Sequence, residues 1–447
     1  MTCLKSQKGV VLIICMIFLC IFTALAVSLA AMSGTNLQIA ANYHKVNRAL
    51  ESAQSGVEIL RFWLDGIYLP GSVQVNQRLN FISSYLNDNL NITTTIIGTD
   101  KITIPPVILD SENSRSFDAA IVKIGDDNDI LRLSVTGHYG PVTRTIAVLY
   151  NFKQRGNTVF DFGVATKGPL LMTGNIELEG VNIAVEASVY IEAQGAATAL
   201  DLTGKCTIAG DVSIVDPVAA AQVSNASSIG GDKGTAAEQH VIQPVPPSEF
   251  PYPDPNYFKQ YVENTIDTNN TVFENIRIPA GKNPTFSGNV TLNGIVFIET
   301  PNVVTFSGNT IVTGIIVGNG DLNDNSKTNQ LVFLGTIDSR SVAELPDEFG
   351  QLKSETGTFI IAPGFGVSFG GNFNTLNGVI AANGVDFFGN AGGNIEGSII
   401  NYSSSSMTLS GNNELRFNRS GITESPAGFT PELRLEYDPN SYSEIVL

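Results

Sequence analysis

The first part of the chain carries the longest apolar run in the sequence. No charged residue lies between Lys8 and Lys45, and Val10–Ala31 is almost wholly apolar. In helical conformation this run is roughly 33 Å long, enough to cross the hydrocarbon core of a bilayer. Because Lys5 and Lys8 precede the run, the positive-inside rule keeps the start in the cytoplasm and exports the bulk of the chain.

Helical periodicity continues beyond this run. Apolar residues recur at steps of four and three at Ile39, Tyr43, Val46, Leu50, Ala53, Val57, Leu60 and Leu64. No proline follows before Pro70, so we predict one helix over residues 10–66, with Gly34 as a position where it can bend. A cleaved secretory signal and an uncleaved single-span anchor are the alternatives, although a signal does not need this extension.

Residues 67–155 mostly show the sequence pattern of β-strands. Residues 81–90 carry a short helical pattern, and β-branched runs punctuated by Gly, Pro, Asp and Asn follow from Ile92. The segment Gly137–Pro141 lies between two such runs and predicts a hairpin connection. We therefore expect a long helix followed by an antiparallel β region.

Two repeat blocks, residues 156–242 and 259–420, alternate short apolar strands with Gly-Asn turns. The repeated phrase places an apolar and a small residue before Gly-Asn, with glycines near 288, 308, 371, 389 and 411, at a spacing of about 20 residues. Such a period favours a parallel β-solenoid, whose coils bury their apolar faces against each other. A large β-sandwich is the alternative.

The solenoid hypothesis makes specific predictions about the repeats. We expect Phe286, Phe306, Phe369 and Phe388 to stack inside, and Asn289, Asn309, Asn372, Asn390 and Asn412 to form a ladder at a turn. The 63 residues from Gly308 to Gly371 fit three steps of 21.

Three segments depart from the repeats. Residues 243–258 are proline-rich, which excludes regular helix and central strand, so we expect a crossing between the blocks or a packed loop. We expect residues 343–357 to form an inserted polar loop or a short helix. Residues 421–447 lack the repeat, and we expect them to cap the open edge of the solenoid.

The formal charge of −17 argues against nucleic-acid binding, which needs clustered Lys and Arg. Three of the four cysteines lie in the first twenty residues, and Cys206 stands alone in the remainder, so neither a disulfide framework nor a zinc site is expected.

The sequence carries no Walker loop and no HExxH, and its three histidines are widely separated. The acidic residues of the clearest repeats are Glu299, Asp338, Asp386 and Glu396, and none has a partner carboxylate at coil spacing. We expect no enzyme activity and no cofactor. Weak calcium candidates are the turns with Asp126, Asp127 and Asp129 and with Asp321, Asn323 and Asn325.

The N-terminus resembles that of type IV prepilins. A short basic leader, residues 1–9, ends in Gln7-Lys8-Gly9 before the apolar run, and the segment 42–58 is similar to minor pilins of the PilX kind. The resemblance implies cleavage after Gly9, with Val10 as the new N-terminus. Most major pilins have Glu at the fifth mature position, where this chain has Ile14. That departure is compatible with PilX-type members and speaks against a bulk filament subunit.

The resemblance also implies partners and a location. The membrane and assembly helix would present Val10, Ile14, Phe18, Phe22, Leu25 and Leu29. Prepilin peptidase and other pilins or pseudopilins would be partners. The chain would lie in the bacterial inner membrane, with a single span, and then in an extracellular filament.

Residues 160–165, 378–384 and 397–401 resemble the right-handed parallel β-helical passengers behind PilX-type N-termini. The implied function is filament initiation, or adhesion to a surface glycan or another host or abiotic surface. The alternative is a membrane-anchored β-helix protein that binds or degrades polysaccharide.

Overall fold

The computed structural model describes residues 8–90, 92–112, 114–125, 130–267, 270–324, 326, 328–421 and 425–445. The chain divides into two compact units. The first comprises Met1–Leu69, Val73–Lys153 and Leu433–Leu447, and the second comprises Pro70–Ser72 and Gln154–Glu432. Most of the second unit is therefore inserted between two segments of the first.

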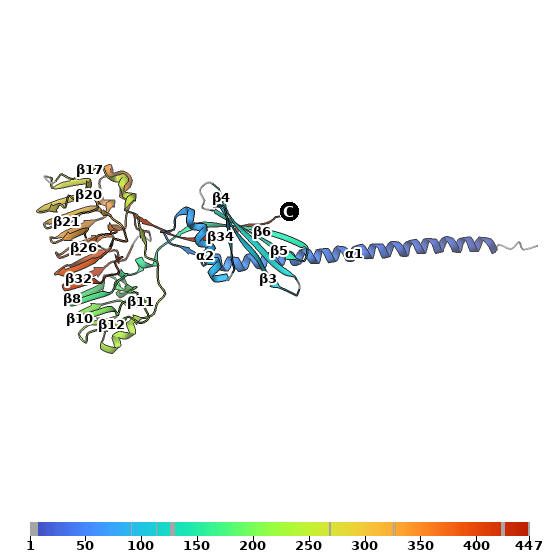
Figure 1. Ribbon diagram of the computed structural model, residues 1–447, viewed down its shortest axis with the longest axis horizontal. Coiled ribbons are helices and arrows are strands. Elements are labelled where there is room, and N and C mark those ends of the chain that lie inside the picture. Colours follow the sequence, from blue (N-terminus) through green and yellow to red (C-terminus); the bar gives the residue numbers. More distant parts are fainter. Residues whose placement is uncertain are drawn as a thin grey trace, which may run out of the picture. The chain divides into compact units, whose positions relative to one another are not determined.

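The first unit begins with one continuous helix, α1 (Lys8–Leu64), which is not interrupted at Gly34 (Figure 1). Its C-terminal part packs on strands β4 and β5 of an antiparallel sheet. The predicted apolar stripe is buried at Ala53, Val57, Leu60 and Leu64. Ile39 and Tyr43 of the same periodic set are exposed, because they lie N-terminal to the part of the helix that the sheet covers.

The antiparallel sheet has seven strands and carries the core of the first unit. Their order is β1 (Tyr68–Leu69), β34 (Glu432–Ile445), β6 (Val142–Arg155), β5 (Ile130–Tyr139), β4 (Arg115–Ile124), β3 (Lys101–Asp110) and β2 (Thr95–Ile97). The predicted hairpin is confirmed, since Tyr139 pairs with Val142 across a tight turn. The helical pattern at 81–90 is also confirmed, as part of α2 (Arg78–Leu90), which follows the short 3₁₀ helix η1 (Val75–Gln77).

We expected the C-terminal tail to cap the repeat region, and this prediction was wrong for residues 432–445. Residues 432–445 form β34, which lies between β6 and β1 in the antiparallel sheet. Tyr437 stacks near Tyr150, with ring centroids 5.7 Å apart, and the backbone N–H of Leu149 donates to Ser441 Oγ at 2.8 Å. The tail buries Leu435 in the core of the first unit, and this burial accounts for its position.

The second unit contains two large sheets, which are parallel except for the antiparallel pair β13–β14. One has 13 strands, with the main order β14-β13-β10-β8-β32-β29-β26-β23-β21-β19, and β12, β27 and β30 beside it. The other has 12 strands, with the main order β15-β11-β9-β7-β31-β28-β25-β22-β20-β18-β17, and β24 beside β22. A small antiparallel pair joins β16 (Tyr252–Pro253) to β33 (Phe429–Thr430). Pairing of successive repeats in parallel distinguishes these sheets from the antiparallel sheets of a β-sandwich.

The strands that precede the proline-rich segment are β7 (Val164–Thr166), β8 (Leu170–Gly180), β9 (Val189–Ile191), β10 (Thr198–Ile208), β11 (Val212–Ile214), β12 (Ala220–Val223), β13 (Ser228–Ile229), β14 (Asp232–Lys233) and β15 (Val241–Ile242). Short 3₁₀ helices accompany them: η2 (Thr158–Asp161), η3 (Ala184–Ala187) and η4 (Gly234–His240).

The strands that follow it are β17 (Asn264–Thr265), β18 (Val272–Ile278), β19 (Thr285–Phe286), β20 (Asn289–Glu299), β21 (Val303–Phe306), β22 (Asn309–Asn319), β23 (Gln330–Phe333), β24 (Ile337–Arg340), β25 (Thr358–Ala362), β26 (Gly366–Phe369), β27 (Thr375–Asn377), β28 (Val379–Ala382), β29 (Val385–Gly389), β30 (Gly392–Glu396), β31 (Ile399–Asn401) and β32 (Met407–Phe417). The 3₁₀ helices here are η5 (Pro255–Tyr261), η6 (Val342–Glu344) and η7 (Asp347–Ser354).

The predicted period is confirmed between β20 and β22, which pair from Asn289 with Asn309 onward at an offset of 20 residues. The prediction of three equal steps from Gly308 to Gly371 was wrong. Val303 pairs with Gln330, and Gln330 pairs with Gly366, so this stretch contains two unequal steps of 27 and 36 residues. The longer step contains η6 and η7, which correspond to the predicted insertion.

The two repeat blocks meet in an order that the sequence analysis did not predict. The last strands of the second block, β31 and β32, pair with the first strands of the first block, β7 and β8. Figure 1 shows β8 beside β32, with β10 and β26 on either side. The proline-rich segment therefore connects opposite ends of the two sheets, and the second block then runs back toward the first.

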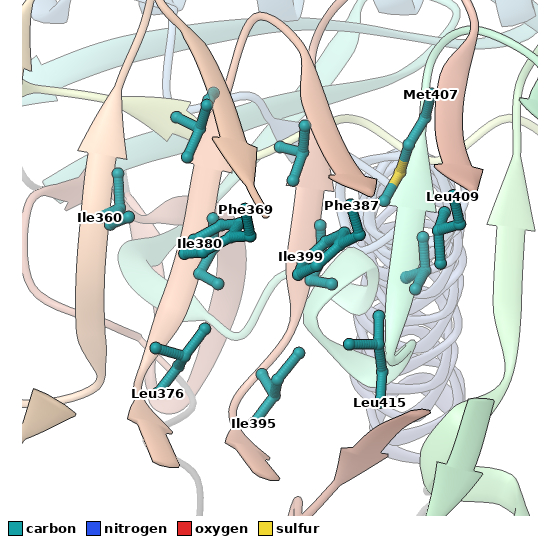
Figure 2. Close-up of a cluster of buried hydrophobic side chains, with 14 of the residues drawn as sticks. Ile360, Phe369, Leu376, Ile380, Phe387, Ile395, Ile399, Met407, Leu409 and Leu415 are labelled. Atoms are coloured by element: carbon teal, nitrogen blue, oxygen red, sulfur yellow. The ribbon is translucent and has the colours of Figure 1, made fainter. Parts of the chain in front are cut away.

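The interior of the second unit is filled by rows of stacked side chains. Ring centroids lie 5.0, 4.7, 4.9 and 5.0 Å apart along the row Phe286, Phe306, Phe333, Phe369 and Phe387. The prediction of Phe388 was wrong by one residue: successive side chains of a strand point to opposite faces, and Phe388 is exposed. Figure 2 shows Phe369, Phe387 and Leu409 in one row and Ile360, Ile380 and Ile399 in another.

The 12-stranded sheet is also covered on its outer face. Helix η5 contacts β20 and β22, and η6 contacts β22. Together with η7 they place Phe258, Val342, Leu345 and Leu352 in an outer apolar cluster. Strand β20 accordingly alternates in burial at first and is then buried continuously, as expected for a parallel strand covered on both faces.

Candidate assembly interface

The N-terminal half of α1 presents an apolar surface that no other part of its unit covers. The six predicted assembly residues, Val10, Ile14, Phe18, Phe22, Leu25 and Leu29, are between 47% and 66% exposed. Other large apolar side chains on this half are also exposed, among them Leu12, Ile17, Ile21 and Leu37. Among the described residues, α1 is the one helix long and apolar enough to cross a membrane.

The predicted processing residues Gly9 and Val10 lie in the first turn of α1, which begins at Lys8. The rest of the predicted leader, residues 1–7, lies outside the described residues. Thr23 Oγ1 donates to the carbonyls of Leu19 and Cys20 at 2.9 Å each, so this polar side chain is satisfied within the helix. Within Val10–Ala31, Ser28 is the one other hydroxyl side chain, so this part of α1 has few polar groups for lipid or a neighbouring helix to solvate.

The C-terminal half of α1 approaches strand β5 very closely at Gly137. A Cβ atom at this position would lie 2.2 Å from both the Ala49 carbonyl oxygen and the Ala53 backbone nitrogen. Ala49 and Ala53 are themselves fully buried. Small residues on both sides thus hold the helix backbone against the sheet and fix where the packed half begins.

A polar cluster marks the change from the exposed to the packed half. Arg48 Nη1 lies 2.9 Å from Glu51 Oε2, and Arg115 Nη2 of β4 lies 3.7 Å from the same oxygen. Buried Ser52 donates to the Arg48 carbonyl at 2.9 Å and accepts from Arg115 Nε at 3.3 Å. Sequence reasoning missed this cluster, whose only signal is that charged residues return to the helix at Lys45 and Arg48.

The calcium candidates gain no support from the described residues. Asp126, Asp127, Asp129 and Asn325 lie outside them. Asp321 Oδ1 accepts from the backbone N–H and the side-chain amide of Asn323, at 2.9 and 3.1 Å, in a local turn. Where the chain is described, no three His, Cys, Asp or Glu side chains gather as a metal-binding group.

The acidic residues considered for catalysis each have a local partner. Glu299 Oε1 lies 2.7 Å from Arg277 Nη2, and Asp338 Oδ2 lies 3.3 Å from Arg340 Nε. Asp386 accepts from the backbone N–H of Thr408 at 3.0 Å, and Glu396 accepts from the Asn377 side chain. The expectation that the chain is not an enzyme stays a prediction.

Two other groups in the second unit have shifted acidity. His240 lies between Asp211 and Asp232, with Nδ1–Oδ1 and Nε2–Oδ2 distances of 2.7 and 3.3 Å. The hydrogen bond to Asp211 is the largest cause that raises the pKa of His240. Cys206 is fully buried and free, and burial raises the pKa of its thiol, which makes it a poor nucleophile.

Comparisons with known proteins support the assignment of the N-terminal region. A family model described as PilX N-terminal matches residues 8–58, the part of the chain that forms most of α1. No curated protein matches the sequence.

A solved structure of the competence-associated pilin ComZ from Thermus thermophilus aligns at 10% identity, over 90% of this chain and 98% of that chain. Its TM-score of 0.26 is too low to support an argument about the fold. The match shows that residues 8–58 are similar to the PilX N-terminal family, and these residues lie in the one long apolar helix of the described chain.

Proposed function

We propose that this chain is a minor-pilin-like component of a type IV pilus or a related secretion filament. It would assemble through α1 and display its inserted β unit for filament initiation or adhesion. The observation that carries the proposal is the division of α1 into two halves. Residues 10–43 expose their apolar side chains, whereas Ala49–Leu64 buries a stripe on the sheet of its own unit.

This division suits a helix that has two successive environments. In the inner membrane, the exposed half would be solvated by lipid, and in a filament it would pack against the helices of neighbouring pilins. Both environments are apolar, so the transfer requires little desolvation of polar groups. With Ile14 at the position where major pilins have Glu, residues 10–43 contain no Asp, Glu, Lys or Arg, which favours a minor role.

The second unit would serve as the displayed part. We propose that its parallel sheets form a β-helix, because successive repeats pair at offsets near 20 residues and stack identical side chains in rows. Acidic residues with individual partners, rather than a convergent pair, favour a binding role without catalysis or cofactor. The partners would be prepilin peptidase, other pilins and a surface ligand.

The first experiment is to determine the mature N-terminus by mass spectrometry, on sheared surface material and on washed membranes. A peptide that starts at Val10 in the sheared fraction would support processing and incorporation in a filament. An intact leader, or a start near Ala31 or Met32, would overturn the pilin proposal and leave a plain anchor or a secreted protein.

A further inference from the structure

A polar pocket of about 120 Å³ lies in the second unit, at the corner of the chain that precedes strands β23, β26, β29 and β32. It is lined by Gln330, Gly366, Val367, Ser368, Asn383, Gly384, Asp386, Ser403, Ser405 and Ser406. A water molecule takes about 30 Å³ of liquid, so this space suits a few waters or one edge of a sugar ring.

The connections between successive strands differ in length at this pocket, and this difference accounts for the hollow. Only Asn383 and Gly384 separate β28 from β29, whereas residues 402–406 separate β31 from β32. Gly384 has φ of +135°, a conformation that side chains rarely adopt, and its carbonyl accepts from Val367 N–H at 2.8 Å. The short connection at residues 383–384 therefore lies deeper than the longer connection at residues 402–406 beside it.

Asn383 forms a fixed part of the pocket wall. The residue is 5% exposed, and its Nδ2 donates to the Leu322 carbonyl at 2.5 Å, which fixes the orientation of the amide. Its Oδ1 is buried and has no hydrogen-bond partner. Because water does not reach Oδ1, this acceptor lies behind the wall, and an occupant of the pocket would meet the other groups of the lining.

Asp386 and Ser403 offer the pocket an acceptor and a donor. Asp386 uses Oδ1 to accept from Thr408, and its Oδ2 accepts none of the hydrogen bonds found among the described residues. Ser403 is buried and accepts from the Ser405 N–H at 3.1 Å, which leaves its hydroxyl hydrogen to donate. The pocket therefore offers acceptors and donors together.

We propose that this pocket binds the hydroxyl-bearing edge of a neutral hexose. Sugar hydroxyls would donate to Asp386 Oδ2 and accept from Ser403. A divalent cation is the weaker fit, because Asp386 is the only carboxylate that lines the pocket and Ca²⁺ takes six to eight oxygen ligands. The inference deepens the proposed display function and rests on it for its biological role, although binding itself does not require a filament.

Gly366 provides a sharp test. A Cβ at this position would meet only the Asn329 carbonyl oxygen, at 4.0 Å, so a side chain can begin here without a backbone clash, and Gly366→Leu is designed to fill the pocket. Asp386→Asn keeps an acceptor for Thr408 and replaces Oδ2 with a donor. Ser404→Leu is the matched control, because Ser404 is exposed and does not line the pocket.

The measurement is saturation-transfer NMR on the full chain in a detergent without sugar head groups. Glucose, galactose, mannose and N-acetylglucosamine are titrated separately, and CaCl₂ forms a further arm. We expect at least one hexose to bind with Kd on the order of 1–10 mM. Gly366→Leu should weaken binding at least tenfold, Asp386→Asn about fivefold, and Ser404→Leu should leave it unchanged.

Three results would overturn the proposal: no hexose binds, Gly366→Leu binds as well as the wild type, or CaCl₂ binds in a manner that Gly366→Leu abolishes while no hexose does. None of these results would affect the mature N-terminus in the sheared fraction. Failure of the ligand proposal is thus distinguishable from failure of the pilin proposal.

Discussion

The two units of this protein are both rich in β-strands, but they bury them in different ways. Strand β5 of the first unit alternates in burial, with Leu131, Leu133 and Val135 in the core. Strand β25 of the second unit is buried at every position. When one face of an antiparallel sheet is covered, apolar and polar residues alternate along each strand, so the sequence shows which side chains face the core. A parallel strand covered on both faces is apolar throughout and gives no such indication.

Both units combine pairs of neighbouring strands with a pair from distant parts of the chain. In the first unit, β4 pairs with β5 and β5 with β6, but Tyr68 of β1 pairs with Arg434 of β34. In the second unit, Leu170 pairs with Met407, so the two blocks are joined by segments from opposite ends of the repeat region. Because the two units have separate hydrophobic cores, we predict that a substitution in one core will leave the other unit folded. Four variants, each in a different part of the molecule, test this and related expectations.

The largest effect is expected from Phe333→Ala, in the aromatic row of the second unit. Phe333 is 1% exposed and stacks between Phe306 and Phe369, so its loss leaves a cavity that the rigid sheets cannot close. We expect the free energy of unfolding of this unit to fall by about 3–5 kcal/mol. Urea denaturation followed by far-UV circular dichroism measures this change.

The single tryptophan, Trp63, lies in α1 and reports on the first unit. Its fluorescence transition should not move in Phe333→Ala, and a shift of both signals would contradict the separation of the units. Phe388→Ala is the matched control, since Phe388 is exposed and should cost less than about 1 kcal/mol.

The second variant, Phe18→Lys, tests the part of α1 that belongs to neither core. Phe18 is exposed, so both unfolding transitions should be unchanged. A lysine at the centre of a membrane helix costs about 2.5–3.5 kcal/mol of insertion free energy. We expect less protein in washed membranes and in sheared material, measured by immunoblotting. Phe18→Leu should behave as the wild type, and equal membrane levels for both variants would contradict a spanning role.

The third variant, Gly137→Ala, tests the contact between α1 and β5. The added Cβ would meet backbone atoms of Ala49 and Ala53, which cannot move as a flexible side chain would. We expect the first unit to lose about 1–3 kcal/mol, with a shift in Trp63 fluorescence. Gly34→Ala is the control: its Cβ meets nothing within 4 Å, so it should not destabilise the unit.

Much of the first unit could be predicted from local patterns. The helix, the short α2 and the β5–β6 hairpin are each specified by residues close in sequence. The tail was misassigned although Leu433, Leu435 and Tyr437 alternate as a strand should. Its partner β6 ends near residue 155, and no local feature indicates a pairing across the intervening second unit.

In the second unit, the repeat period was readable, but the order of the blocks was not. The repeated phrase gives the same signal wherever a strand lies in the sheet, so it cannot show that β32 pairs with β8. The candidate assembly residues followed from the apolar run alone. The pocket at Asn383 did not, because its lining residues come from four corners whose proximity depends on the register of the sheets.

The smallest effect is expected from Glu186→Gln, at the contact between the two repeat blocks, which we call the seam. Glu186 is 6% exposed. Burial alone would raise the pKa of Glu186, but hydrogen bonds from the Asn182 side chain and the N–H groups of Asn182, Arg419 and Ile183 outweigh it and lower the pKa. The bond from Arg419 N, 3.0 Å long, joins the end of the second block to the first.

A pKa that is lower in the folded state means that Glu186 stabilises the protein above its unfolded pKa of about 4.3, and that this contribution is lost as the pH falls through the folded value. Glu186→Gln places an amide N–H against these donors and should cost about 1 kcal/mol at pH 7. The difference from the wild type should shrink below pH 4 in urea denaturation followed by circular dichroism. Glu348→Gln, at an exposed position, is the control. A difference that persists unchanged into acid would mean that the shape of the side chain, and not its charge, holds the seam.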